Sequence, residues 1–469
     1  MREIPEFAVI GRVNKGKSSI VSTLAEDDTV QIESAAGTTK SCRRYPVRLD
    51  GEKTLLVLID TPGFQQAPRA LAWLREHEVS AADRQEVVAA FLETFRNSGE
   101  FIDECRLLEP IMQGAGILYV VDGARPFRRS YEAEMEILRW TGRPRMALIN
   151  KIGEGDHSDD WRPALDQYFS MVRSFDAQNV RFEDRIGLLQ AFRELHEPWR
   201  AALDETIRLL QQDWQRRERE AAHIIARLLV DELTCSLEIS LQRHERIEDR
   251  QQKIVDEFHQ TLRRYEARAR RHIEGLYQHS RIAVEESELE RPLFEQDLFA
   301  EQTWAMLGLS GKQLVALGAV TGAAVGGVLD TAVGGASFMA GSLLGGLVGA
   351  GTALYYSGHR LATIQDLGTY FRGGRVVRIG PHKNKNFPWI VLDRALLHYR
   401  SIRDRAHSVQ EPVKIDANQK AGVVSRLAPS QRKKLAKIFT DLQKKRFTDT
   451  ARLERRLEDQ ILKIIQDDG

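Results

Sequence analysis

Residues 11–18 read Gly11-Arg12-Val13-Asn14-Lys15-Gly16-Lys17-Ser18 and follow a short apolar run from Phe7 to Ile10. They fit the pattern G-x-x-x-x-G-K-[ST], and the next residues continue as a predicted helix. A strand that turns into a helix through this pattern is typical of a phosphate-binding loop, because glycines let backbone N–H groups approach the phosphates. A glycine- and lysine-rich surface turn is the alternative, but it does not account for the flanking strand and helix.

The residue types of this loop predict a nucleoside triphosphate site. Lys17 is expected to reach the β- and γ-phosphates and Ser18 to bind Mg²⁺, while the following helix presents its positive end. The predicted phosphate-binding residues are Gly11, Asn14, Lys15, Gly16, Lys17, Ser18 and Ser19.

Composition limits the class of protein. A chain of 469 residues is too long for one core and predicts two or three domains. Lys and Arg (68) nearly balance Asp and Glu (67), so any attraction to nucleic acid must be local. Cys42, Cys105 and Cys235 are too far apart for a zinc site and odd in number, which favours a reducing cytosol. We expect no signal peptide before the first strand.

Several apolar runs alternate with helical patterns, which predicts a doubly wound, mostly parallel α/β sheet with its ligand at the carboxyl ends of the strands. The run over residues 54–59 ends in Asp60-Thr61-Pro62-Gly63, where Asp60 can hold Mg²⁺ through water and Gly63 can turn its N–H onto a γ-phosphate. Another run ends in Asn150-Lys151. The predicted strands are residues 7–10, 45–50, 54–59, 117–122, 146–149 and 171–175.

These motifs, with Gly37-Thr38-Thr39 between the first two, resemble the Era/TrmE-type GTPases of bacteria. The resemblance implies that Thr39, or its neighbour Thr38, closes onto Mg²⁺ and the γ-phosphate. It implies that Asn150 and Lys151 hold the base, with Ala177 near it. Asn14 matches an asparagine that, in several such GTPases, helps place a K⁺ ion. The catalytic residues implied are Lys17, Asn14 and Thr39, and the metal ligands are Ser18, Thr39 and Asp60.

Two positions depart from the pattern of that family. Phe64 stands where Ras-like proteins keep a water-positioning glutamine, so backbone, a cation or a partner would place the water. Arg12, Arg43 and Arg44 are either cationic helpers or plain surface charge. The base motif N-K-x-D ends in Gly153, and Glu154 or Asp156 could replace the missing aspartate. Guanine specificity is therefore expected but depends on that replacement.

The rest of the chain is predicted to be mainly helical. We expect a G domain over 1–195 with an enlarged switch II region at about 64–114, helical over 70–76 and 83–96. Long charged helices follow over 196–304, because between Pro198 and Pro292 there is one glycine and no proline. The last part, 359–469, carries a predicted strand near 374–380 and a basic helical stretch from Lys420 to Arg446. The alternative is that this basic stretch is only the solvated face of one final helix that continues through Ile464.

Residues 305–358 form an apolar stretch in which glycines recur every fourth residue, as in Gly318, Gly322 and Gly326. Small residues at this spacing let helices approach closely in lipid. We expect a helical hairpin whose legs, within 313–357, are about 25 and 33 Å long by the helical rise, against a hydrocarbon core of about 30 Å. A hairpin buried against protein is the alternative reading.

The apolar stretch and Asn386-Phe387-Pro388-Trp389, followed by Leu392-Asp393-Arg394-Ala395-Leu396, are similar to an uncharacterised C-terminal domain (domain of unknown function 3482) found on Era-like GTPases. We therefore expect a slow GTPase that hydrolyses GTP to GDP and phosphate with Mg²⁺. Its nucleotide state would control a membrane-associating helical half at the inner face of the bacterial cell membrane. Alternatives are a GTPase that binds ribosome or tRNA through its basic tail, and a switch with negligible hydrolysis. A second G domain, pairing as a homodimer, is another candidate partner.

Overall fold

The computed structural model describes residues 4–12, 15–25, 42–49, 53–78, 80–151, 155–176, 180–242, 245–277, 364–369, 375–382, 385–404, 423–444 and 450–467. The chain divides into two compact units, and the boundary falls after Gln215, within the long helix α8 (Arg200–Thr234).

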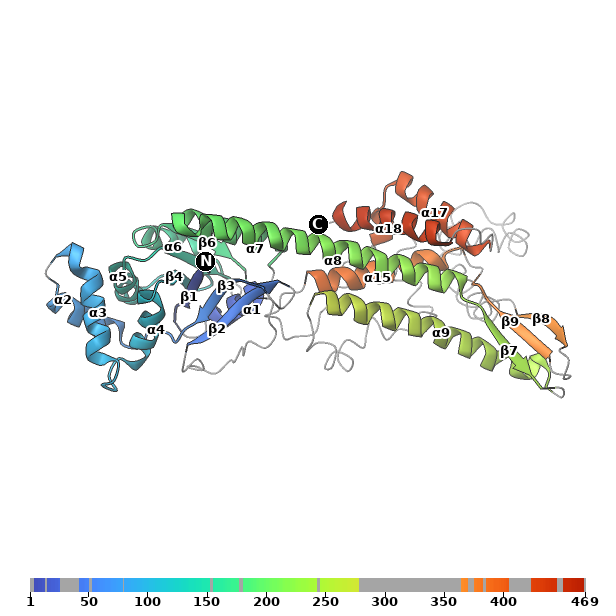
Figure 1. Ribbon diagram of the computed structural model, residues 1–469, viewed down its shortest axis with the longest axis horizontal. Helices are drawn as coiled ribbons and strands as arrows, with labels where there is room; N and C mark the ends of the chain where they lie inside the picture. Colours follow the sequence, from blue (N-terminus) through green and yellow to red (C-terminus); the bar gives the residue numbers. More distant parts are fainter. Residues whose placement is uncertain are drawn as a thin grey trace, which may run out of the picture. The chain divides into compact units, whose positions relative to one another are not determined.

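The first unit is built on a six-stranded sheet in the order β2-β3-β1-β4-β5-β6 (Figure 1). All neighbouring strands are parallel except β2 and β3, which are antiparallel. The predicted doubly wound, mostly parallel sheet is therefore confirmed. The strands are β1 (Glu6–Ile10), β2 (Arg43–Leu49), β3 (Lys53–Asp60), β4 (Gly116–Asp122), β5 (Arg145–Asn150) and β6 (Met171–Phe175).

Both faces of this sheet are buried, because successive side chains of its central strands alternate between two apolar cores. Ala8 and Ile10 of β1 face one core, whereas Phe7 and Val9 face the other. The first core is covered by α2 (Ala67–Glu76), α3 (Arg84–Phe95), α4 (Ile102–Met112), α5 (Glu132–Trp140) and α6 (Ser158–Leu165). The second is covered by α1 (Lys17–Ala25), α7 (Phe182–Leu195) and the start of α8.

The residues between Gly63 and Gly116 form three helices, α2, α3 and α4, where the sequence predicted two. Their apolar side chains join the first core, including Leu74, Phe91 and Leu108. Figure 1 shows them, in light blue to teal, beside the sheet of the first unit. Each fully buried side chain of this size contributes about 1.5–3 kcal/mol, so the insertion is part of the folded core.

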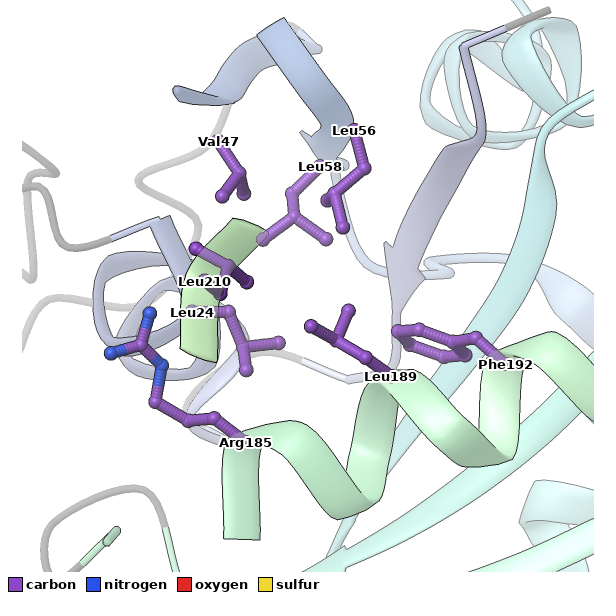
Figure 2. Close-up of a pocket in the computed structure, with 8 residues that line it drawn as sticks. All are labelled: Leu24, Val47, Leu56, Leu58, Arg185, Leu189, Phe192 and Leu210. Carbon is purple, nitrogen blue, oxygen red and sulfur yellow. The ribbon is translucent and has the colours of Figure 1, made fainter. Parts of the chain in front are cut away.

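On the second face of the sheet, mostly apolar side chains enclose a small cavity between the strands and the helices α1, α7 and α8. Figure 2 shows these side chains directed toward one another from strands and helices. None belongs to the predicted phosphate loop, so the cavity is separate from the nucleotide site. Its lining consists of Leu24, Val47, Leu56, Leu58, Arg185, Leu189, Phe192 and Leu210.

The second unit is mostly helical, as expected, with a small antiparallel sheet in the order β7-β9-β8. Its strands are β7 (Leu237–Leu241), β8 (Ile364–Thr369) and β9 (Arg375–Ile379). The strand β7 lies where continuous helix was expected. Its residues alternate apolar and polar, and their burial alternates in step, which is the pattern of a strand with one buried face.

The helices of the second unit are the end of α8, α9 (Ile247–Leu276), α15 (Phe387–Arg403), α16 (Val423–Arg426), α17 (Pro429–Gln443) and α18 (Thr450–Asp467). A buried ion pair between Arg394 of α15 and Glu266 of α9, at 2.6 Å, joins two of them. The alternative reading, in which one final helix runs from the basic stretch to Ile464, was wrong. The chain forms α17 and α18 instead, because their two apolar stripes pack against each other.

The apolar hairpin predicted over 305–358 lies outside the described residues. Within the described ranges, no helix combines the length and the apolar character that crossing a bilayer requires.

Candidate functional site

The polar ends of four parallel strands meet at one edge of the sheet. Asp60 at the end of β3 lies beside Val9, and Asp122 at the end of β4 lies beside Asn150 at the end of β5. The phosphate loop leaves β1 at the same edge. Parallel strands place their carboxyl ends together, so the motifs predicted from sequence are brought to one site.

Two glycines set the path of the phosphate loop. Gly11 has φ of 149°, and a Cβ atom there would lie 2.3 Å from the carbonyl oxygen of Val120. Gly16 has φ of 80°, and its carbonyl accepts the N–H of Ile20 at 2.9 Å, the first turn of α1. Any other residue at these positions would push the loop away from β4 or strain its backbone.

Lys17 lies inside the loop. Its Nζ donates to the carbonyl of Arg12 at 3.0 Å, and only 7% of the residue is exposed. Burial lowers the pKa of this ammonium, while the negative charges of Asp60 and Glu134 oppose the shift. The ammonium is thus held close to the backbone of the phosphate loop.

Ser18 and Asp60 form an oxygen pair suited to Mg²⁺. The hydroxyl of Ser18 donates to Oδ2 of Asp60 at 3.0 Å, although the two residues are 42 positions apart. Asp60 is 3% exposed, and the next residue, Thr61, donates its hydroxyl to the carbonyl of Val9 at 2.8 Å. Hard oxygen ligands, one of them anionic, are what Mg²⁺ prefers, so these residues fit that ion.

The base motif is tied to the phosphate loop. The amide of Asn150 donates to the carbonyl of Lys15 at 3.3 Å, and Nζ of Lys15 lies 3.0 Å from Oδ2 of Asp122. Lys151 contacts Asp156, with Nζ 2.8 Å from Oδ2, and this hydrogen bond lowers the pKa of the carboxyl. The other oxygen of Asp156 accepts the N–H of Ser158.

Arg12 is engaged by the start of α5. Its guanidinium donates to Glu134 and to the carbonyl of Ser130, and it lies 3.8 Å from the ring centroid of Tyr131. Glu134 also accepts the hydroxyl of Tyr119 at 2.9 Å. The guanidinium is therefore occupied by protein groups in this structure.

Phe64 directly follows the D-T-P-G motif and is buried in the first apolar core, with 7% exposed. The backbone N–H groups of Gln65 and Gln66 are both accepted by Glu104 of α4. The segment after Gly63 is thus held by the buried side chain of Phe64 and by the two backbone hydrogen bonds to Glu104.

Two known protein families match parts of the sequence of this chain. Residues 6–151 match the family described as "50S ribosome-binding GTPase", and residues 162–466 match the family described as "Domain of unknown function (DUF3482)", which is more than half of the 469 residues. The chain belongs to the DUF3482 family. It carries a P-loop GTPase domain at its amino-terminal end, as the resemblance implied.

Curated relatives match part of this DUF3482 protein. GTPase Der of Lactobacillus helveticus is 29% identical over 199 residues, covering 39% of this chain and 42% of that protein. The tRNA modification GTPase MnmE of Saccharophagus degradans is 32% identical over 105 residues, 21% of either chain. The chain thus spans less than half the length of these curated relatives. A solved structure of Era from Aquifex aeolicus bound to GDP and AlF₄⁻ is 18% identical and covers 37% of this chain and 52% of its own, with a TM-score of 0.26.

The DUF3482 structure describes most of the residues predicted at the site, and it brings Gly11, Lys15, Gly16, Lys17, Ser18, Asp60, Gly63, Asn150 and Lys151 to one edge of the sheet. Ser19 lies in α1 beside Ser18. Asn14, Thr38, Thr39, Gly153, Glu154 and Ala177 lie outside the described residues.

Sequence reasoning missed three acidic residues of this site: Asp122 as the partner of Lys15, Glu134 as the partner of Arg12, and Glu104. Asp122 ends a predicted strand at the ligand edge, which was a usable signal. Glu104 and Glu134 lie inside amphipathic helices, where an acidic residue usually faces solvent, and only the fold reveals what they contact.

Proposed function

We propose that this DUF3482 protein binds GTP with Mg²⁺ and hydrolyses it to GDP and phosphate. The observation that carries the proposal is the hydroxyl of Ser18 lying 3.0 Å from the carboxylate of Asp60, beside the buried ammonium of Lys17. The GTPase family match over residues 6–151 supports the same conclusion.

Ser18 and Asp60, with Thr39, would hold the Mg²⁺ ion. The ion neutralises charge on the β- and γ-phosphate oxygens when bound. Lys17 binds those phosphates from the other side, and the N–H of Gly63 approaches the γ-phosphate. Asn150 and Lys151 hold the base, next to Ala177, and Asp156 supplies the carboxylate that reads guanine.

Calorimetry tests nucleotide binding directly. Wild-type protein should bind GTP and GDP in the presence of Mg²⁺, and Lys17→Ala should lose binding. Lys53→Ala is the matched control, because Lys53, the first residue of β3, forms an exposed ion pair with Glu205 of α8. Heat from neither nucleotide with folded wild-type protein would refute the proposal.

Hydrolysis is expected to be slow without a partner or cation, because Phe64 offers no group to position water. Asn14 is proposed to help place K⁺, which would act in place of an arginine finger. Phosphate release should be faster in K⁺ than in Na⁺, and Asn14→Ala should remove the difference. Equal rates in both salts for both proteins would exclude the ion. Binding without any phosphate release would favour the alternative, a switch with negligible turnover.

We further propose that nucleotide state controls association of residues 313–357 with lipid, at the inner face of the bacterial membrane. The support is sequence: between Lys312 and His359 the only charged residue is Asp330. Liposome flotation with GTP, GDP and no nucleotide should give different bound fractions. No flotation in any state would refute membrane association. Sedimentation with GDP and AlF₄⁻ tests pairing of two G domains.

A second candidate is binding to ribosome or tRNA. Lys433, Lys434 and Lys437 form an exposed basic face on α17, and phosphates attract such a face. One matching family is described as ribosome-binding, and one relative is a tRNA modification GTPase. Cell fractionation separates the candidates: sedimentation with ribosomes favours this one, and release from a membrane pellet by detergent favours the first.

A further inference from the structure

A single buried carboxylate oxygen holds the backbone directly after the D-T-P-G motif. Oε1 of Glu104 accepts the N–H of Gln65 at 2.8 Å and the N–H of Gln66 at 2.6 Å. Glu104 is 1% exposed, and Gln66 is the residue that caps α2. The carboxylate therefore binds the N-terminal end of α2. The first amide that it holds, that of Gln65, comes one residue after Phe64 and two after Gly63.

Burial of a carboxylate costs free energy unless hydrogen bonds compensate for it. Here the compensation comes from two backbone amides at the positive end of a helix, a favourable place for an anion. No ion pair to Glu104 occurs within the described part of the chain. The interaction consequently depends on where the backbone of Gln65 and Gln66 lies.

Neighbouring contacts fix the carboxylate in place. Phe101, just before α4, has φ of 54°, a left-handed conformation that a bulky residue rarely adopts. Its ring packs against Phe95, and Arg69 of α2 lies over the same ring, 5.3 Å from its centroid. Arg69 also pairs with Glu100 at 2.6 Å. The start of α4 is thus bound to the start of α2 by several independent contacts, and the strained residue is retained among them.

We propose that Glu104 is a positioning residue for GTP hydrolysis: by holding the amides of Gln65 and Gln66, it fixes the peptide of Gly63 where its N–H meets the γ-phosphate. This inference rests on the proposed function. It gives the helices inserted after the motif a chemical task, because a carboxylate of α4 supports the backbone that directly follows the motif.

The test compares Glu104→Ala with Glu104→Gln. Alanine removes the acceptor, so kcat for GTP should fall about 10- to 100-fold. KM for GTP should rise about fivefold or more because the contact to the γ-phosphate weakens, whereas GDP affinity should stay within about threefold because the phosphate loop is untouched. Glutamine keeps Oε1 as an acceptor for both amides and should restore most of kcat. Glu136 provides matched controls: it is 8% exposed and accepts the indole N–H of Trp140 at 2.9 Å, away from the motif. Glu136→Ala and Glu136→Gln should leave kcat unchanged.

A binding measurement separates this inference from the proposed hydrolysis. The ratio of GTPγS affinity to GDP affinity reports the contact to the γ-phosphate, whether or not the protein turns over. The ratio should fall at least fivefold in Glu104→Ala and recover in Glu104→Gln. An unchanged ratio, or equal losses in Glu104→Ala and Glu136→Ala, would overturn the positioning role. Wild-type protein that binds both nucleotides but releases no phosphate would refute hydrolysis alone.

Discussion

The ammonium of Lys15 lies 3.0 Å from the carboxylate of Asp122, and the two side chains are only 7% and 6% exposed. The pair joins the phosphate loop to the end of β4. Asn150, at the end of β5, donates its side-chain amide to the backbone carbonyl of the same lysine. Three segments far apart in sequence are thereby held in one arrangement by contacts within the protein.

Asp122→Ala should destabilise the GTPase unit, because it leaves the charge of Lys15 buried without its partner. Breaking such a pair costs about 3–5 kcal/mol. Urea unfolding should show this loss, and GTP affinity should fall with it. Asp156→Ala is the control: it breaks the exposed pair with Lys151 and should leave the free energy of unfolding nearly unchanged. Equal stability of the two variants would contradict the prediction.

Asp156 should determine the preference for guanine. It contacts Lys151 of the base motif, and a carboxylate can accept two hydrogen bonds from guanine that adenine cannot offer. Asp156→Ala and Asp156→Asn should therefore lower the ratio of GTP to ATP affinity about tenfold or more, measured by competition against a fluorescent nucleotide. Asp159→Asn, an exposed acid nearby on α6, serves as the control. A ratio that stays at the wild-type value in Asp156→Ala would assign the base to other residues.

Two glycine substitutions should affect different properties: Gly11→Ala should abolish nucleotide binding, and Gly187→Ala should increase stability. Gly11→Ala places a Cβ atom 2.3 Å from a backbone oxygen of β4, so the loop must move and nucleotide binding should be lost. Gly187, inside α7, has open space at its Cβ position. Gly187→Ala should raise the free energy of unfolding by about 0.4–1 kcal/mol through helix propensity and leave binding intact. Calorimetry and thermal unfolding measure both outcomes; binding by Gly11→Ala at wild-type affinity would refute the first.

The stability of the second unit should depend on Asp393 at acidic pH. This residue of α15 is fully buried, and burial raises its pKa to about 6, although the N–H of Val424 donates to it. The folded carboxyl binds its proton more tightly than the unfolded one, whose value is 3.8. The contribution of Asp393 to the free energy of unfolding is therefore fully present below pH 3.8 and is lost as pH rises through about 6.

Asp393→Asn removes this titration and keeps an acceptor for Val424. The difference in unfolding free energy, wild type minus variant, should fall as pH rises from about 4 to about 6 and stay level above pH 7. Urea unfolding monitored by circular dichroism measures it. A difference that is constant over the whole range would mean that Asp393 titrates alike in the folded and unfolded chain.

The sequence determined the sheet and the main residues of the site. A phosphate loop, Asp60 and Asn150 each follow an apolar run, and parallel strands must place such ends at one edge, so local patterns fixed a shared location. Strand bounds agreed within about two residues, because central strands buried on both faces read as continuous apolar runs in the sequence.

Only the tertiary structure decided which charged side chains are buried. Glu104 and Glu134 look like solvent-facing acids in sequence, and the partners Gln66 and Arg12 lie 38 and 122 positions away. Asp122 ends a predicted strand, but its partner Lys15 lies 107 positions away. The short strand β7 and the separate helices α17 and α18 also depend on segments that pack from elsewhere. Burial of a charge depends on long-range packing that periodicity does not encode. The sequence therefore named the phosphate-binding groups, and the fold selected the residues that hold them in position.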